Sequence, residues 1–119
     1  MMESILRDKS YLFALRVVRL YKHLNEQHKE YILSKQILRS GTSIGALVRE
    51  AQYAQSTKDF INKMSIALKE ANESQYWLIL LKDTEYITKK MHDYIEPDIN
   101  ELKKILTSSI NTAKKNLHK

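Results

Sequence analysis

The chain has 119 residues, a formal net charge of +6 at pH 7, 43% hydrophobic residues and 29% charged residues. This length suits one domain, spanning residues 1–119, with a single hydrophobic core. Cysteine is absent, which excludes disulfides and thiolate metal ligands, while two glycines and one proline indicate few, long elements. The N-terminus carries charges where a signal peptide needs apolar residues, and no apolar run reaches membrane length. We therefore expect a cytoplasmic protein without a membrane partner.

The first expected helix runs from about residue 4 to residue 28, and the polar run 25–30 is expected to form the following turn. Its apolar side chains recur at helical spacing, which predicts a face turned toward the core. Arg16, Arg19 and His23 are predicted to point away from this face. The residues of the apolar face are Phe13, Val17, Leu20, Tyr21 and Leu24.

The second expected helix covers about residues 32–54 and has an unusually small face. Gly41 and Gly45 lie four residues apart, although each glycine inside a helix costs about 1 kcal/mol relative to alanine. A soluble helix keeps such residues where a neighbour must come close. The pattern predicts a tightly packed helix contact, and a ligand groove at the two glycines is the alternative. The stripe comprises Ile37, Gly41, Ile44, Val48 and Ala51.

The third expected helix starts after Ser56, which with Asp59 has the spacing of a capping box, and extends to about Lys82. Near its end every position of Tyr76–Leu81 is apolar. One neighbouring helix cannot cover an apolar surface on all sides, so the segment predicts a deep central helix or a subunit contact. The predicted interface residues are Tyr76, Trp77, Ile79 and Leu80. Tyr76 and Trp77 could instead stack on the bases of a single strand, although burial is the favoured interpretation.

The fourth expected helix covers about residues 89–116, with Thr88 as its N-cap. Pro97 lacks a backbone donor, so we expect it to kink or interrupt this helix near Ile95. The apolar stripe comprises Met91, Ile95, Ile99, Leu102, Leu106, Ala113 and Leu117. Four helices with short connections predict an all-α, antiparallel up-down-up-down four-helix bundle.

The positive charge is concentrated at the two ends of the sequence. Residues 1–24 carry five basic and two acidic residues, whereas residues 103–119 carry five basic residues and no acidic one. In an antiparallel bundle the first and last helices are neighbours, so these segments are predicted to form one patch. Solvated helix faces are the simpler interpretation, and phosphate contacts to nucleic acid are the functional one. The candidate phosphate contacts are Arg16, Arg19, Lys103, Lys104, Lys114 and Lys115.

Patterns typical of enzymes are scarce. No histidine has a glutamate three residues before it, as di-iron bundles require, and no His-Glu-x-x-His zinc motif occurs. Glu70 and Glu73 could form a general acid/base pair, but a solvated face or interface salt bridges explain them more simply. We expect no catalytic residues, no metal and no cofactor.

The second and third expected helices carry a specific resemblance. The motif Arg39-Ser-x-x-Ser43-Ile-Gly-Ala46, continued by the helix around 60–81, is similar to the four-helix-bundle family of 23S ribosomal RNA intervening-sequence proteins. The resemblance covers about residues 13–115. It implies an antiparallel four-helix bundle and a homo-oligomer, specifically a pentamer. Some members are encoded inside ribosomal RNA gene insertions, and a related branch of retroelement accessory proteins is linked to nucleic acid and reverse transcriptase.

One residue departs from the family pattern, because Leu47 stands where members typically have asparagine. Any role of that amide therefore does not carry over to this chain. The resemblance provides no catalytic residues. The sequence predicts a non-enzymatic homo-oligomer that contacts RNA or DNA through its first and last helices. The alternative is a protein-interaction adaptor or scaffold that uses the Tyr76–Leu81 surface or the Gly41/Gly45 groove and has no nucleic-acid partner.

Overall fold

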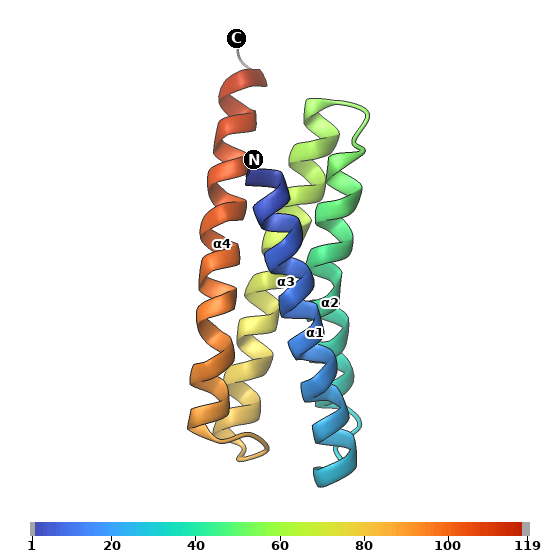
Figure 1. Ribbon diagram of the computed structural model, residues 1–119, viewed down its shortest axis with the longest axis vertical. Coiled ribbons are helices and arrows are strands. Elements are labelled where there is room, and N and C mark those ends of the chain that lie inside the picture. The colour runs from blue at the N-terminus through green and yellow to red at the C-terminus, as the bar shows by residue number, and fades with distance from the viewer. Residues whose placement is uncertain (1, 118–119) are drawn as a thin grey trace.

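The computed structural model describes residues 2–117, with side chains from residue 4 onward, and these residues form a bundle of four helices. The chain runs up and down the bundle, and α1 packs on α2, α2 on α3, α3 on α4 and α4 on α1 (Figure 1). The bundle measures 52 × 21 × 20 Å. The fold class predicted from the sequence is confirmed. The helices are α1 (Met2–His28), α2 (Leu33–Gln52), α3 (Thr57–Asp83) and α4 (Lys89–Leu117).

The core consists of the predicted apolar stripes, which meet along the bundle axis. Phe13 and Val17 of α1, Ile44 of α2, Leu78 of α3 and Leu106 of α4 are each 0% exposed. Burial of such a side chain contributes about 1.5–3 kcal/mol relative to its exposed state. Three edge positions differ from the prediction, since Tyr21 and Met91 are half-buried and Leu117 is exposed.

The helix ends follow local hydrogen bonding. Ser56 Oγ accepts a hydrogen bond from the Asp59 amide at 3.0 Å, and Thr88 Oγ accepts one from the Met91 amide at 3.1 Å. Both predicted N-caps are therefore confirmed. The return contact of the capping box falls one residue early, because the Asp59 carboxylate accepts from the amide of Gln55 at 3.3 Å.

α1 ends at His28, the residue predicted from the sequence, so residues 25–28 belong to the helix and the turn begins at residue 29. Lys29 has a φ of 53°, and the amide of Glu30 donates to the carbonyl of Leu24 at 3.1 Å. The left-handed residue terminates α1, and the hydrogen bond from Glu30 closes the turn that follows it. The Glu30 carboxylate then accepts a hydrogen bond from the Ser34 amide at 2.8 Å, which caps the start of α2.

The predicted interruption at Pro97 is wrong, because α4 is continuous from Lys89 to Leu117 with Pro97 inside it. Proline removes the amide that would bond to the carbonyl of Asp93, four residues earlier. Both Pro97 and Asp93 are exposed, so water can satisfy that carbonyl. A solvent-facing proline thus costs the helix less than a buried one would.

The two glycines of α2 make the close contact that the small face predicted. A Cβ atom on Gly41 would lie 2.7 Å from Val17 Cγ2 of α1, whereas a Cβ on Gly45 would lie 3.5 Å from the Ser10 carbonyl oxygen. The backbone of α2 therefore approaches α1 directly at Gly41. This packing fills the space in which the alternative, a ligand groove, would have lain.

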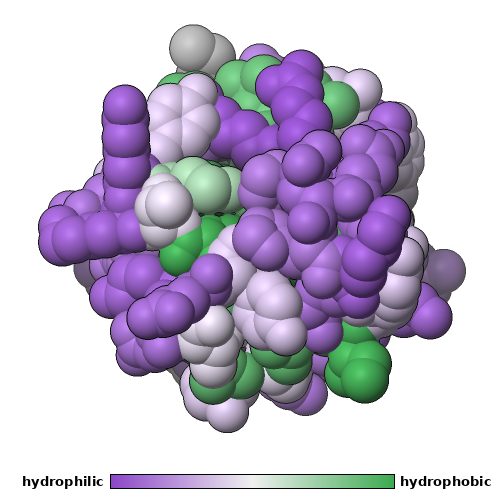
Figure 2. Space-filling model, turned by 90° about the horizontal axis from the view of Figure 1, so that it is seen from below, coloured by the Kyte–Doolittle hydropathy of each residue, from purple (hydrophilic) through white to green (hydrophobic). Residues whose placement is uncertain are grey.

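Most of the end formed by the α1/α2 and α3/α4 loops is hydrophilic, with small separate apolar areas (Figure 2). Among the described residues, no helix is long and apolar enough to cross a membrane.

Candidate nucleic-acid interface and apolar surface

The C-terminal half of α4 presents a polar, basic surface. Lys103, Lys104 and Lys115 border one shallow depression on this helix, and we call these three residues the basic face of α4. No acidic residue occurs between Leu102 and Leu117. The depression is also lined by Asn100, Thr107, Ser108, Asn111 and Thr112. Cations and neutral hydrogen-bonding groups thus share one face, a combination that suits phosphate oxygens.

The lysines of this half of α4 differ in how they are held. Lys103 Nζ donates to Gln75 Oε1 of α3 at 3.1 Å, so this ammonium lies beside α3. Lys104, Lys114 and Lys115 are exposed. The depression does not include Lys114, and Lys119 lies outside the described residues.

Arg16 is half-buried at the contact between α1 and α4, an engagement that the sequence does not predict. Arg16 forms an ion pair with Asp98 of α4, and its guanidinium lies 5.0 Å from the centre of the Tyr94 ring. The hydrogen bond that Arg16 donates to the Asp98 carboxylate raises the pKa of Arg16 further above its ordinary value. Lys9 also pairs with Glu101 across the same helix contact at 2.7 Å. Two acidic residues therefore interrupt the predicted single patch between α1 and α4.

A groove lies between α1 and α4, and the sequence does not predict it. It has a volume of about 470 Å³, and its floor is formed by Leu20 and Ile95, which are both nearly fully buried. Arg19 and Lys90 are exposed at its edge, and Tyr94 is 66% exposed. We call this feature the α1/α4 groove. Its lining residues are Arg16, Arg19, Leu20, His23, Lys90, Met91, Tyr94 and Ile95.

The predicted interface residues of α3 divide between the core edge and the surface. Tyr76 is 58% exposed and Ile79 is 41% exposed, whereas Trp77 and Leu80 are half-buried. Trp77 is held in place, since its indole N–H donates to Glu73 Oε2 at 3.0 Å and its ring meets that of Tyr76 edge-on. Tyr76 and Ile79 form what we call the α3 apolar surface.

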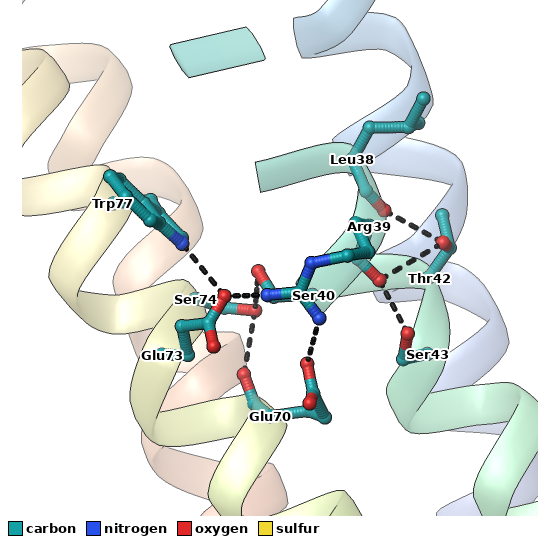
Figure 3. A network of polar contacts seen from close by, with 9 residues as sticks. All are labelled: Leu38, Arg39, Ser40, Thr42, Ser43, Glu70, Glu73, Ser74 and Trp77. Carbon is teal, nitrogen blue, oxygen red and sulfur yellow. Dashed lines mark hydrogen bonds and ion pairs between the residues drawn. The ribbon is translucent and has the colours of Figure 1, made fainter. Parts of the chain in front are cut away.

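The two candidate acid/base carboxylates bind one arginine (Figure 3). Arg39 of α2 donates to Glu70 at 3.0 Å and also pairs with Glu73. Glu70 is only 8% exposed, and a carboxylate this far from water needs such a partner. Beside it, Ser74 Oγ donates to Ser40 Oγ at 2.9 Å and lies 2.9 Å from the carbonyl oxygen of Glu70. The carboxylates thus connect α2 to α3. Within the described part of the chain, no three His, Cys, Asp or Glu side chains are grouped to hold a metal ion.

These features define a small antiparallel helical bundle with a glycine contact between α1 and α2 and an Arg–Glu network between α2 and α3. The chain belongs to the family of 23S rRNA-intervening sequence proteins, whose family model matches residues 2–108.

One similar solved structure is that of a protein of unknown function from the S23 ribosomal protein family of Bacteroides thetaiotaomicron. It is 57% identical to this chain, covers 93% of this chain and 99% of its own length, and superposes with a TM-score of 0.92. None of the curated proteins compared with this chain matches it.

The motif that indicated the family has a structural explanation in this fold. Arg39 binds the carboxylates of α3, Ser40 bonds to Ser74, and Gly41 admits Val17. Leu47, which is expected to depart from the family pattern, is half-buried and packs against the core. The motif residues therefore fix how α2 contacts its two neighbours.

Proposed function

We propose that this protein is a non-enzymatic homo-oligomer that binds the phosphate backbone of RNA or DNA through the basic face of α4. The observation that carries the proposal is the acid-free surface around Lys103, Lys104 and Lys115. Lys104 and Lys115 are eleven residues apart, about 16 Å along a helix axis. A run of phosphates can therefore be contacted at two points along one strand.

The chemistry of this surface favours positioning without sequence readout. Lysine ammonium groups attract phosphates as point charges, and the neighbouring asparagine, serine and threonine side chains can hydrogen-bond to phosphate or sugar oxygens. The family name refers to ribosomal RNA, and the similar solved structure comes from a ribosomal protein family. Both names agree with RNA as the partner.

A charge-reversal experiment tests the proposal. Lys104→Glu together with Lys115→Glu should weaken binding of single-stranded and duplex RNA and DNA, measured by fluorescence anisotropy. Across a salt series, the slope of log K against log[salt] should become shallower by about one unit for each lysine removed.

Lys35→Glu together with Lys58→Glu is the matched control. Both lysines are exposed in first helical turns, at the start of α2 and of α3, where an acidic residue is compatible with the helix dipole. This control makes the same change in net charge and should retain most of the affinity. Binding that is absent at low salt, or that does not respond to salt, contradicts the proposal.

The α3 apolar surface favours a second candidate function. Tyr76 and Ile79 lie on the outside of the bundle, where they are accessible to a partner protein. An adaptor would use this surface for a partner protein and would not need the basic face. Partner binding that survives the Lys104 and Lys115 reversals, in a protein that binds no nucleic acid, supports the adaptor.

A further inference from the structure

We propose that the α1/α4 groove binds a nucleotide unit of a single strand, with its unpaired base against Tyr94 and its phosphates at Arg19 and Lys90. The inference rests on the proposed function and deepens it, because it names the form of nucleic acid and the place of a base. The basic face alone does not distinguish a single strand from a duplex.

The shape of the groove fits one base. Its volume of about 470 Å³ lies within the usual range for small-ligand sites. On α1 its wall extends from Arg16 to His23, about 10 Å of helix. The nearly buried side chains of Leu20 and Ile95 form the apolar floor of the groove. A nucleotide is a ligand of this size class, and its nucleobase presents a flat apolar face to these two side chains.

The position of Tyr94 suits stacking on a nucleobase. Tyr94 is 66% exposed, so its side chain is accessible to a ligand beside the apolar groove. The Arg16 guanidinium lies 5.0 Å from the ring centre, and the ion pair with Asp98 fixes that guanidinium. The ring is therefore supported by a cation and still offers surface to a ligand. Aromatic rings bind bases of single strands in this way, largely without sequence preference.

The charge around the groove complements an anion. Arg19, His23 and Lys90 line it together with Arg16, and none of its lining residues is acidic. Arg16 is already paired with Asp98, so Arg19 and Lys90 are the exposed cations available to a phosphate. An uncharged apolar ligand would not contact these cations, whereas a nucleotide contacts both the apolar floor of the groove and the cations at its edge.

The groove and the basic face lie on the same helix, with Asp98 and Glu101 between them, and these two carboxylates are already paired with Arg16 and Lys9. Lys90 and Tyr94 are four residues apart, and Lys104 follows ten residues after Tyr94, about 15 Å along α4. A single strand that inserts one base in the groove can therefore continue along α4 toward Lys104 and Lys115. In a duplex the base is paired and stacked, so its face cannot reach Tyr94.

The experiment compares Tyr94→Leu, Tyr94→Phe and Tyr53→Leu. Tyr53 is 87% exposed at the C-cap of α2 and provides a matched exposed tyrosine. The probes are a single-stranded RNA of about 12 nucleotides, the same sequence closed into a duplex, and adenosine monophosphate alone.

Tyr94→Leu should weaken single-strand binding about tenfold, with the salt slope unchanged because no charge is lost. Tyr94→Phe should restore the affinity, Tyr53→Leu should have no effect, and duplex binding should stay the same in all three variants. A strand carrying 5-bromouridine should crosslink to Tyr94, located by mass spectrometry in the wild-type protein.

The remaining outcomes separate the two proposals. If Tyr94→Leu binds the single strand with wild-type affinity while the Lys104 and Lys115 reversals weaken binding, the groove proposal is overturned and the proposed function stands. If Tyr94→Leu weakens the binding of single strand and duplex equally, the groove proposal is also overturned. Adenosine monophosphate that binds as tightly as the strand, and is lost in Tyr94→Leu, supports the groove with a free nucleotide as its ligand. Absence of binding by every probe overturns both proposals.

Discussion

Gly41 of α2 faces Val17 of α1 so closely that a Cβ atom on the glycine would lie 2.7 Å and 2.9 Å from the two methyl carbons of the valine. Val17 is fully buried, and a β-branched side chain has one strongly preferred rotamer in a helix. The valine therefore cannot turn aside to admit an extra carbon. The glycine lets the two helices approach, and it does so despite its low helix propensity.

Gly41→Ala should accordingly destabilise the protein by about 1–3 kcal/mol, the usual cost of overpacking a core. This loss exceeds the gain of about 1 kcal/mol that alanine brings to a helix. Urea unfolding followed by circular dichroism measures the difference. Gly45→Ala is the control, because its new Cβ would meet Ser10 at an ordinary 3.5 Å. That variant should be unchanged or slightly more stable, and equal destabilisation of both variants would contradict the explanation.

The ion pair between Arg39 and Glu70 predicts energetic coupling between α2 and α3. Removing the guanidinium in Arg39→Met leaves the nearly buried Glu70 carboxylate without its 3.0 Å partner, a costly state. Adding Glu70→Gln should recover part of that loss. A double-mutant cycle in urea should give a coupling of about 1–3 kcal/mol. Additive effects of the two changes would show that the pair contributes nothing to stability.

The elements that the sequence predicted well are those whose signals are local. A core stripe such as Ile37 to Val48 repeats within one helix, and a cap such as Ser56 with Asp59 is complete within four residues. These patterns depend on hydrogen bonds and burial that any helix in a bundle must satisfy. Helix number, helix ends within a few residues and the core positions therefore followed from the sequence.

The features that the sequence did not predict depend on contacts between distant residues. The ion pair of Arg16 has no local signal in the sequence, because its partner Asp98 lies 82 positions later in the chain. The carboxylates Glu70 and Glu73 similarly receive their arginine from the preceding helix. The α1/α4 groove arises only when the two outer helices pack, so Tyr94 had no local signal that marked it as part of a site.

We expect the free energy of unfolding to depend on pH through the carboxylate of Asp93. Its oxygens lie 2.6 Å from Lys89 Nζ and 3.0 Å from His92 Nδ1, and the bond from Lys89, followed by that from His92, holds the pKa of Asp93 below its ordinary value of 3.8. The unfolded chain therefore binds this proton more readily than the folded protein. The stabilisation is complete above the ordinary pKa and is lost as the pH falls through the folded pKa.

An NMR titration of the Asp93 carboxyl carbon should show a midpoint below 3.8. Lys89→Met should move that midpoint upward, because it removes the larger of the two interactions. The stability difference between wild type and Asp93→Asn should shrink as the pH falls through this range. A midpoint at or above the ordinary value would contradict the prediction.

The α3 apolar surface predicts how the protein self-associates. Tyr76 and Ile79 are 58% and 41% exposed, and their burial in a subunit contact would contribute about 1 kcal/mol each. We expect an oligomer, a pentamer, for the wild-type protein in sedimentation velocity at micromolar concentration. Tyr76→Glu combined with Ile79→Lys leaves the net charge unchanged and should weaken association by at least about tenfold.

Tyr53→Glu combined with Ile32→Lys makes the same two exchanges at the loops, where these side chains are 87% and 75% exposed. This control should sediment like the wild type, because neither residue belongs to the α3 apolar surface. Loss of association in the control as well would place the contact elsewhere on the bundle. A wild-type protein that is monomeric throughout would leave Tyr76 and Ile79 available to a different protein, as the adaptor function requires.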